Sequence, residues 1–152
     1  MRRATRHSGL RGRFAAAQCS TTRFRASTAS PNARALARIY GAVAANTGEL
    51  PISKPVIDFI TGDAPPPRHD EVLGIDTRYH LGLRRSSPRL QFGSPDGRAF
   101  GTPGMGGSLA FGDPSTGIGF GYTMNRLSMA LEDEYRCKKL QAAVSKSLTA
   151  QR

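Results

Sequence analysis

Serine, lysine, histidine and tyrosine all occur in this sequence of 152 residues, but not at the spacings that make a serine hydroxyl nucleophilic. Covalent catalysis by serine needs a base beside the hydroxyl, which the Ser-x-x-Lys and Gly-x-Ser-x-Gly motifs provide, and neither motif occurs. A Tyr-x-Asn triplet is missed by one residue, because Tyr122 is followed by asparagine only at Asn125. The phosphate-binding run Gly-x-x-x-x-Gly-Lys and the dinucleotide-binding run Gly-x-Gly-x-x-Gly are absent as well. The sequence therefore predicts no activated nucleophile within these residues.

Metal ligands and redox-active cysteines are also sparse. The three histidines are scattered, and only His69 has acidic neighbours, in the run His69-Asp70-Glu71. That run follows consecutive prolines, so we interpret it as a solvated cluster in a loop and not as a metal site. Cys19 and Cys137 are too few and too far apart for a disulfide framework or a zinc site, and two lone thiols are typical of a reducing compartment. No metal and no cofactor are predicted.

One stretch of the sequence is rich in glycine, since ten of the 17 glycines fall between Gly93 and Gly121. Residues without a Cβ atom allow tight turns and close approach by another group. Two strands are predicted here, at residues 106–111 and 118–125, joined by the turn residues Asp113-Pro114-Ser115-Thr116-Gly117. We expect an antiparallel hairpin. Because the second strand has two glycines and a threonine on one face, we expect that a helix packs close to it.

Two helices are predicted before this stretch. The first begins at Ser30-Pro31, where serine can cap the helix and proline fits the first turn, and it ends at Asn46-Thr47-Gly48. Its expected buried stripe consists of Ala35, Leu36, Ile39, Tyr40 and Val43. The second helix begins at Ser53 and ends at Gly62, and its expected buried residues are Val56, Ile57, Phe59 and Ile60.

The remaining elements are a strand and a terminal helix. Alternating Thr77, Tyr79, Leu81 and Leu83 predict the strand, and the polar run Arg84-Arg85-Ser86-Ser87-Pro88 predicts a turn after it. A helix is predicted from about Ala130 to Leu148, with acids at its start, lysines further along, and Leu140, Val144 and Leu148 as its buried stripe. Helices with an antiparallel hairpin indicate an α+β fold.

The net charge of +11 is unevenly distributed along the chain. Residues 1–30 contain seven arginines and no acid, which leaves 15 of the 22 basic residues against all 11 acidic ones in residues 31–152. A nucleic-acid-binding domain is expected to carry its basic excess on a folded face with interleaved aromatic residues. The excess here lies in a tail, so nucleic acid is not predicted as a partner.

The tail permits two interpretations. Its arginine-rich, serine-rich and acid-free composition is typical of an organelle transit peptide, and it also fits an unstructured tail or an inaccurate start site. We expect residues 1–30 to be separate from a folded domain at residues 31–150, and the protein to be intracellular, in the cytoplasm or the mitochondrion. No run approaches the roughly 18 apolar residues of a membrane span, so none is predicted. No pattern indicates an oligomeric state.

One run of the sequence resembles a known family. The run Phe100-Gly101-Thr102-Pro103-Gly104-Met105-Gly106-Gly107-Ser108 is followed by a strand, Asp113-Pro114, a glycine turn, and a strand that leads to Met124-Asn125. It resembles the C-terminal part of the serine β-lactamase-like hydrolases, in the branch with class C β-lactamases, penicillin-binding DD-peptidases and family VIII carboxylesterases. Similar members read Phe-Gly-His-x-Gly-x-Gly-Gly-Ser there. Residues 32–40, 72–75 and 79–83 resemble the preceding helix and connecting strand of the same family.

The resemblance implies the C-terminal part of a β-lactamase/transpeptidase-like fold, an antiparallel sheet with packing helices, without the part that carries the nucleophile. It places the family's third motif on Thr102-Pro103-Gly104, a strand that lines the substrate cleft. The backbone N–H of Met105 is then one of two donors to the oxyanion of the tetrahedral intermediate. Thr102 departs from the family, which has lysine, histidine or tryptophan at this position.

Two functions follow from these observations. In the first, the chain is the C-terminal portion of a hydrolase that acts on small esters or amides through an acyl-enzyme, and it is inactive by itself. In the second, it is a non-catalytic scaffold or binding module derived from that fold, as the departure at Thr102 suggests.

Overall fold

The computed structural model describes residues 32–129 and 135–150, apart from the side chain of Thr149. The predicted tail, the predicted helix start at Ser30-Pro31 and the acidic residues 132–134 lie outside the described residues. The described elements are the helices α3 (Ala33–Ala44), α4 (Lys54–Thr61) and α5 (Tyr135–Ala150), and the strands β1 (Arg68–Asp70), β2 (Ile75–Thr77), β3 (Tyr79–His80), β4 (Leu83–Arg85), β5 (Phe100–Gly104), β6 (Ser108–Asp113) and β7 (Ile118–Tyr122).

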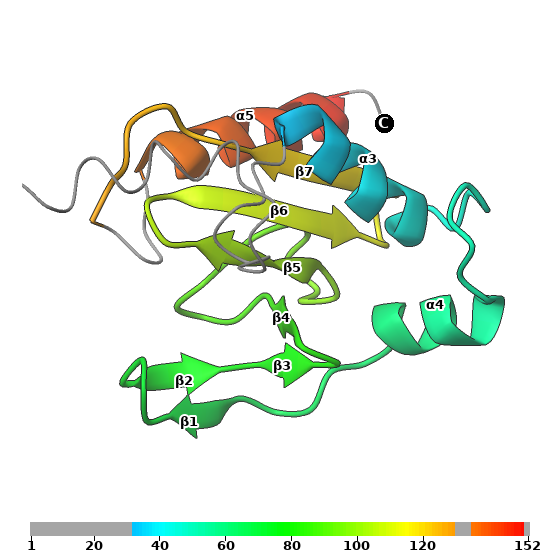
Figure 1. The fold of residues 1–152 in the computed structure, drawn as a ribbon, viewed down its shortest axis with the longest axis horizontal. Helices are drawn as coiled ribbons and strands as arrows, with labels where there is room; N and C mark the ends of the chain where they lie inside the picture. Colours follow the sequence, from blue (N-terminus) through cyan, green and yellow to red (C-terminus); the bar gives the residue numbers. More distant parts are fainter. Residues whose placement is uncertain (1–31, 130–134, 151–152) are drawn as a thin grey trace, which may run out of the picture. The chain divides into compact units, whose positions relative to one another are not determined.

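An antiparallel sheet with helices on both faces forms the centre of the fold (Figure 1). Its five strands have the order β3-β4-β5-β6-β7, and β1 and β2 form a separate hairpin. Helices α3 and α4 share a core with Phe100 on one face, and α5 packs against Phe111 and Phe120 on the other through Cys137 and Val144. The α+β fold class is therefore confirmed, as is the hairpin of β6 and β7. Within the described residues, no helix is both long and apolar enough to cross a membrane.

Helix α3 packs directly on the glycines of the hairpin, as the small face of β7 predicted. A Cβ atom added to Gly119 would collide with the backbone of Ala37 and Gly41, and one added to Gly121 would collide with the carbonyl of Ala33. Such close approach is available only where neither partner carries a side chain at the contact.

The buried stripe predicted for α3 is partly wrong. Val43 is buried, but Ile39 is 52% exposed and Ala35 is exposed as well. The helix contacts the sheet through small residues, whereas the hydrophobic periodicity predicted that its large apolar residues would be buried there. The helix also begins later than expected, because the side chain of Asn32 caps it by accepting a hydrogen bond from the Ala35 N–H at 2.8 Å.

Helix α4 has the predicted bounds, with Ser53 at its N-cap and Gly62 at its C-cap. Its predicted burial is correct for Ile57, whereas Val56 and Phe59 are exposed. A helix of 8 residues contacts the sheet along one narrow edge, so a stripe of four buried residues was too wide.

The region from Thr77 to Pro88 departs most from the prediction. The chain reverses at Leu81 and Gly82, whose φ angles are 52° and 76°, so a hairpin of β3 and β4 replaces the single predicted strand. The expected polar turn is also wrong, because Arg84 and Arg85 belong to β4 and are buried.

Arg85 is buried, and backbone carbonyls accept hydrogen bonds from both of its terminal nitrogens, whereas its buried Nε has no partner among the described residues. The side chain is 1% exposed, and it donates to the carbonyls of Ile60, Gly62 (2.8 Å) and Arg98 (2.6 Å). Two of these carbonyls lie at the C-terminal end of α4, where a helix lacks internal donors. Burial lowers the pKa of Arg85, and the neighbouring charges of Arg78 and Arg98 lower it further, while Asp63 opposes them.

Helix α5 was predicted from about residue 130, and its described part begins at Tyr135. Its buried face includes Cys137, with Val144 partly buried against the core, whereas Leu140 is exposed, which corrects one position of the predicted stripe. Cys137 is only modestly hydrophobic, but it is buried because its position on the helix faces the sheet.

The contact between α3 and β7 can be tested with Gly119→Ala. We expect a loss of about 2 kcal/mol in the free energy of unfolding, because the added methyl group meets backbone atoms that have no rotamer to change. Urea denaturation measures the loss. The control is Thr123→Ala, an exposed position just beyond the same strand, for which we expect a change below about 0.5 kcal/mol. Equal effects of the two substitutions would contradict the close packing.

The role of Arg85 can be tested with Arg85→Met. We expect a loss of about 3 kcal/mol, since three backbone carbonyls lose a charged donor. The matched control, Arg89→Met, removes a guanidinium at an exposed position and should change stability by less than about 0.5 kcal/mol. Denaturation by urea compares the two variants, and a stable Arg85→Met protein would refute this account of the burial.

Candidate active-site strand and glycine turn

The second half of β5 has a partner strand on one side only. All of β5 pairs with β6, from Phe100 opposite Gly112 to Gly104 opposite Ser108. Strand β4 pairs with β5 only at Phe100 and Gly101. Residues 102–104 therefore form a local edge within the sheet, where Pro103 is tolerated because an edge strand can spare one donor.

The three predicted site residues lie together at the end of this strand. Thr102 is exposed, and its hydroxyl lies 3.4 Å from the carbonyl of Pro103. Gly104 is half-buried under the Ser108 side chain, whose hydroxyl a Cβ atom on Gly104 would meet. The Met105 side chain is 84% exposed. The backbone of this segment is thus accessible along its open side.

A tight turn follows the strand and is held by two backbone hydrogen bonds. The Gly107 N–H donates to the Gly104 carbonyl at 3.1 Å, and Gly106 and Gly107 have φ angles of 94° and 105°. The Ser128 N–H donates to the Gly106 carbonyl at 2.8 Å. The turn is therefore supported by a segment that follows β7 in the sequence.

This supporting segment was missed by the sequence reasoning. Leu127 and Met124 lie against Gly106, so closely that a Cβ atom on this glycine would meet both side chains. Met105, Leu127 and Met129 are among the most exposed large apolar residues of the described chain. The available signal was the pair Leu127 and Met129, two large apolar residues between the predicted strand and the predicted terminal helix.

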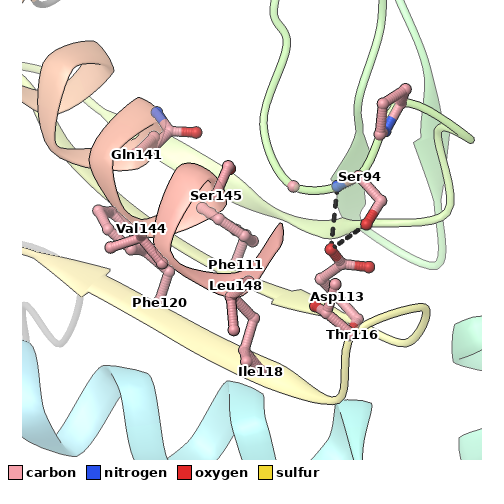
Figure 2. Close-up of a pocket in the computed structure, with 12 residues that line it drawn as sticks. Ser94, Phe111, Asp113, Thr116, Ile118, Phe120, Gln141, Val144, Ser145 and Leu148 are labelled. Atoms are coloured by element: carbon pink, nitrogen blue, oxygen red, sulfur yellow. Dashed lines mark hydrogen bonds between the residues drawn. The ribbon is translucent and has the colours of Figure 1, made fainter. Parts of the chain in front are cut away.

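The cavity shown in Figure 2 lies elsewhere, between α5 and the opposite face of the hairpin. It has a volume of about 370 Å³, with Phe111, Ile118, Phe120, Val144 and Leu148 among its apolar lining. At its rim, the buried carboxylate of Asp113 accepts hydrogen bonds from the N–H and hydroxyl of Ser94, at 2.9 and 2.6 Å, and from the Ser115 N–H at 3.0 Å.

The groups around this cavity suit a structural role better than covalent catalysis. Among the described residues that line it, none is a histidine, lysine or cysteine that could serve as a base or nucleophile near neutral pH. Asp113 instead ties the tip of the β6–β7 hairpin to the segment at Ser94. Elsewhere in the described ranges, no three histidine, cysteine or acidic side chains gather where they could hold a metal ion.

Comparison with known proteins identifies similar chains. No protein-family model matches the sequence. A curated relative, "Esterase/beta-lactamase LipL" of Mycobacterium tuberculosis (strain ATCC 25618 / H37Rv), is 36% identical over a match that covers 62% of this chain and 22% of the relative.

Three solved structures share the fold. A family VIII carboxylesterase has a TM-score of 0.66 at 34% identity, over 76% of this chain and 31% of that chain. A penicillin-binding protein homologue from Caulobacter crescentus has a TM-score of 0.63 at 34% identity, over 75% and 31%. EstA from Arthrobacter nitroguajacolicus Rue61a has a TM-score of 0.67 at 27% identity, over 82% and 34%. The matches thus span between 22% and 34% of the length of these four proteins.

The support of the glycine turn by the Leu127 segment can be tested with Gly106→Ala. Gly74→Ala is the matched control, because Gly74 also has a positive φ angle (65°) but has no neighbour at the Cβ position. We expect the control to cost about 1 kcal/mol from backbone strain alone, and Gly106→Ala to cost about 2 kcal/mol more. Thermal unfolding measures both variants. Equal losses would show that the contacts of Leu127 and Met124 with the turn are unimportant.

Proposed function

We propose that this chain, which is similar to β-lactamase-like serine hydrolases, forms the oxyanion side of an acyl-transfer cleft for small esters or amides. The matches cover less than two thirds of the length of each relative. The activity is therefore proposed from the geometry of the site at residues 102–105. The attacking serine and its base belong to a Ser-x-x-Lys element, which this sequence does not contain. The chain alone is therefore expected to be inactive.

The observation that supports this role is the open backbone between Thr102 and Met105. The turn uses the N–H groups of Gly107 and Ser128 for its hydrogen bonds, and in the described part of the chain the Met105 N–H is not among the donors to the turn. Such a backbone donor is well suited to the negative charge of a tetrahedral intermediate, where one donor lowers the activation free energy by about 3 kcal/mol.

Each proposed site residue has a separate role. Gly104 has no side chain of its own, so the Ser108 hydroxyl lies over its backbone and the substrate carbonyl approaches from the open side of the strand. Met105 contributes its N–H, and its exposed side chain adds an apolar surface beside the cleft. Thr102 occupies the position that faces the substrate, and it has no charge to offer an acidic group of the substrate. We therefore propose uncharged esters as better substrates than carboxylate-bearing β-lactams.

The proposed compartment is intracellular, in the cytoplasm or the mitochondrion. Its support is the cysteine content of the sequence, because Cys19 and Cys137 are too few and too far apart for a disulfide framework. Sparse cysteines of this kind are typical of a reducing environment.

A chimera tests the proposed function directly. Residues 32–150 would replace the matching third of the family VIII carboxylesterase, which supplies the nucleophile. We expect hydrolysis of a p-nitrophenyl ester, a rise with Thr102→His, and a loss of about a hundredfold in kcat with Gly104→Val, because a branched side chain blocks approach to the Met105 N–H. Val72→Ala, an exposed position in the β1–β2 hairpin, is the control.

Two results would contradict the proposal. One is a folded chimera that remains inactive with either residue at position 102. The other is turnover of the ester or of a chromogenic cephalosporin by the isolated chain, which would show that a nucleophile is present among its own residues.

The second candidate function, a non-catalytic binding module, is favoured by Thr102 at a position where the family has a charged or aromatic residue. A module of this kind should unfold cooperatively and remain dispersed. Circular dichroism and size-exclusion chromatography of the isolated chain measure these properties. Aggregation without a cooperative transition would count against the module.

A further inference from the structure

Two neighbouring cavities lie along one side of helix α5. The first, which we call the apolar cavity, is the one of about 370 Å³ in Figure 2. The second, which we call the polar cavity, has a volume of about 390 Å³ and lies between α5 and the segment from Pro88 to Gly93. Gly93, Gln141 and Ser145 line both cavities, so the two are adjacent. The recess that they form along the helix therefore changes from apolar to polar.

The apolar cavity is larger than the gaps that close packing leaves. Protein interiors contain few voids larger than a water molecule, and cavities of this size are typical of small-molecule sites. Val144 and Leu148 of α5 face Phe120 and Ile118 of β7 across it (Figure 2). Because such walls offer water few hydrogen bonds, the cavity is suited to an apolar group.

The polar cavity is cationic. Arg89 lies on one wall and Lys138 on the other, and among the described residues that line this cavity none is acidic. Helix α5 adds the positive charges of Arg136, Lys139 and Lys146, and its described part contains no acid. Positive charge on both walls attracts a negatively charged group.

Asp113 is the single acid among the described residues that line the apolar cavity. Its carboxylate is 1% exposed and already accepts hydrogen bonds from Ser94 and Ser115. It does not line the polar cavity. A cationic headgroup therefore meets no unsatisfied carboxylate among the described residues of the recess, whereas an anionic headgroup meets two cations.

The side of α5 that lines the recess changes from charge to hydrocarbon. Lys138, Gln141, Ser145 and Leu148 follow one another at intervals of three and four residues, which places them on one face of the helix. The helix rises by about 15 Å from Lys138 to Leu148, about half of the thickness of a bilayer's hydrocarbon core. A single alkyl chain with an anionic group at one end fits this length.

We propose that the recess binds a free alkyl carboxylate, with the alkyl chain in the apolar cavity and the carboxylate between Arg89 and Lys138. Burial of methylene groups provides most of the affinity, and the two cations select the charge of the headgroup. This non-covalent binding does not rest on the proposed oxyanion role, because in the described structure none of residues 102–105 lines either cavity.

A series of ligands tests the proposal with the full chain. Isothermal titration calorimetry measures the binding of hexanoate, octanoate and decanoate, and of octan-1-ol and octyltrimethylammonium, which have the chain of octanoate without its negative charge. We expect the affinity to rise about tenfold for each two methylene groups added, because the cavity buries them. We expect octanol to bind at least about tenfold more weakly than octanoate, since it lacks the charge-assisted hydrogen bonds. The cation should show no saturable binding.

Two double variants locate the headgroup. Arg89→Gln combined with Lys138→Gln removes both cations of the polar cavity, and it should weaken octanoate binding by about tenfold without a change in octanol binding. The matched control combines Lys139→Gln with Lys146→Gln. It removes the same charge from exposed positions of α5 that line neither cavity, so it should leave the binding of both ligands unchanged. Circular dichroism establishes that both proteins are folded.

A third variant fills the apolar cavity. Val144→Phe places a ring in the space of the alkyl chain and should weaken the binding of octanoate and octanol alike, by about tenfold or more. If Val144→Phe does not fold, the ligand series and the charge variants alone decide.

Several results would overturn the proposal. They are the absence of saturable decanoate binding up to about 1 mM, equal affinities for the three carboxylates, equal affinities for octanoate and octanol, and unchanged octanoate binding by the protein that lacks the cations of Arg89 and Lys138. Co-sedimentation with phosphatidylglycerol vesicles, without saturable binding of any of the carboxylates, would assign these cations to a membrane surface and would also refute it.

Discussion

Contact between two stretches of backbone, in α3 and in the β6–β7 hairpin, determines most of this fold. The glycines of the hairpin remove the side chains that normally separate a helix from a sheet, so carbonyl and amide groups of α3 lie directly against Gly119 and Gly121. Because no flexible side chain lies between the two backbones, a rotamer change cannot accommodate a small change in this spacing. The contact fixes the distance between α3 and the sheet. It thereby determines the space available to the core around Phe100 on the same face.

A second constraint is the burial of Arg85. The side chain crosses from β4 to the end of α4 and satisfies carbonyls that neither element can satisfy itself. Arg98 and Arg78 donate to nearby carbonyls, those of Thr61 and of Ala64 and Pro65. Charged side chains here replace the apolar contacts that a helix of 8 residues cannot provide. The segment after α4 is thereby held against the sheet mainly by hydrogen bonds.

The open half of β5 gives the molecule its candidate site surface. At residues 102–104 the strand edge is short and ends in a glycine turn, which suits a small carbonyl group that needs one or two donors. The roles of Thr102, Gly104 and Met105 stay predictions, whereas the relationship to β-lactamase-like hydrolases is confirmed by the comparisons.

Local patterns in the sequence were sufficient for the α+β class, the bounds of α4, the hairpin of β6 and β7, and the close packing of a helix on its glycines, because turn residues and the absence of Cβ atoms act over short range. The same patterns failed where burial depends on distant partners. Arg85 is buried because it donates hydrogen bonds to the carbonyls of Ile60 and Gly62. Ile39 is exposed because α3 contacts the sheet through alanine and glycine. Likewise, the sequence identified the run from Thr102 to Met105, but only the tertiary structure brought Leu127 and Ser128 against its turn, since no short-range signal connects segments about twenty residues apart that meet through a sheet.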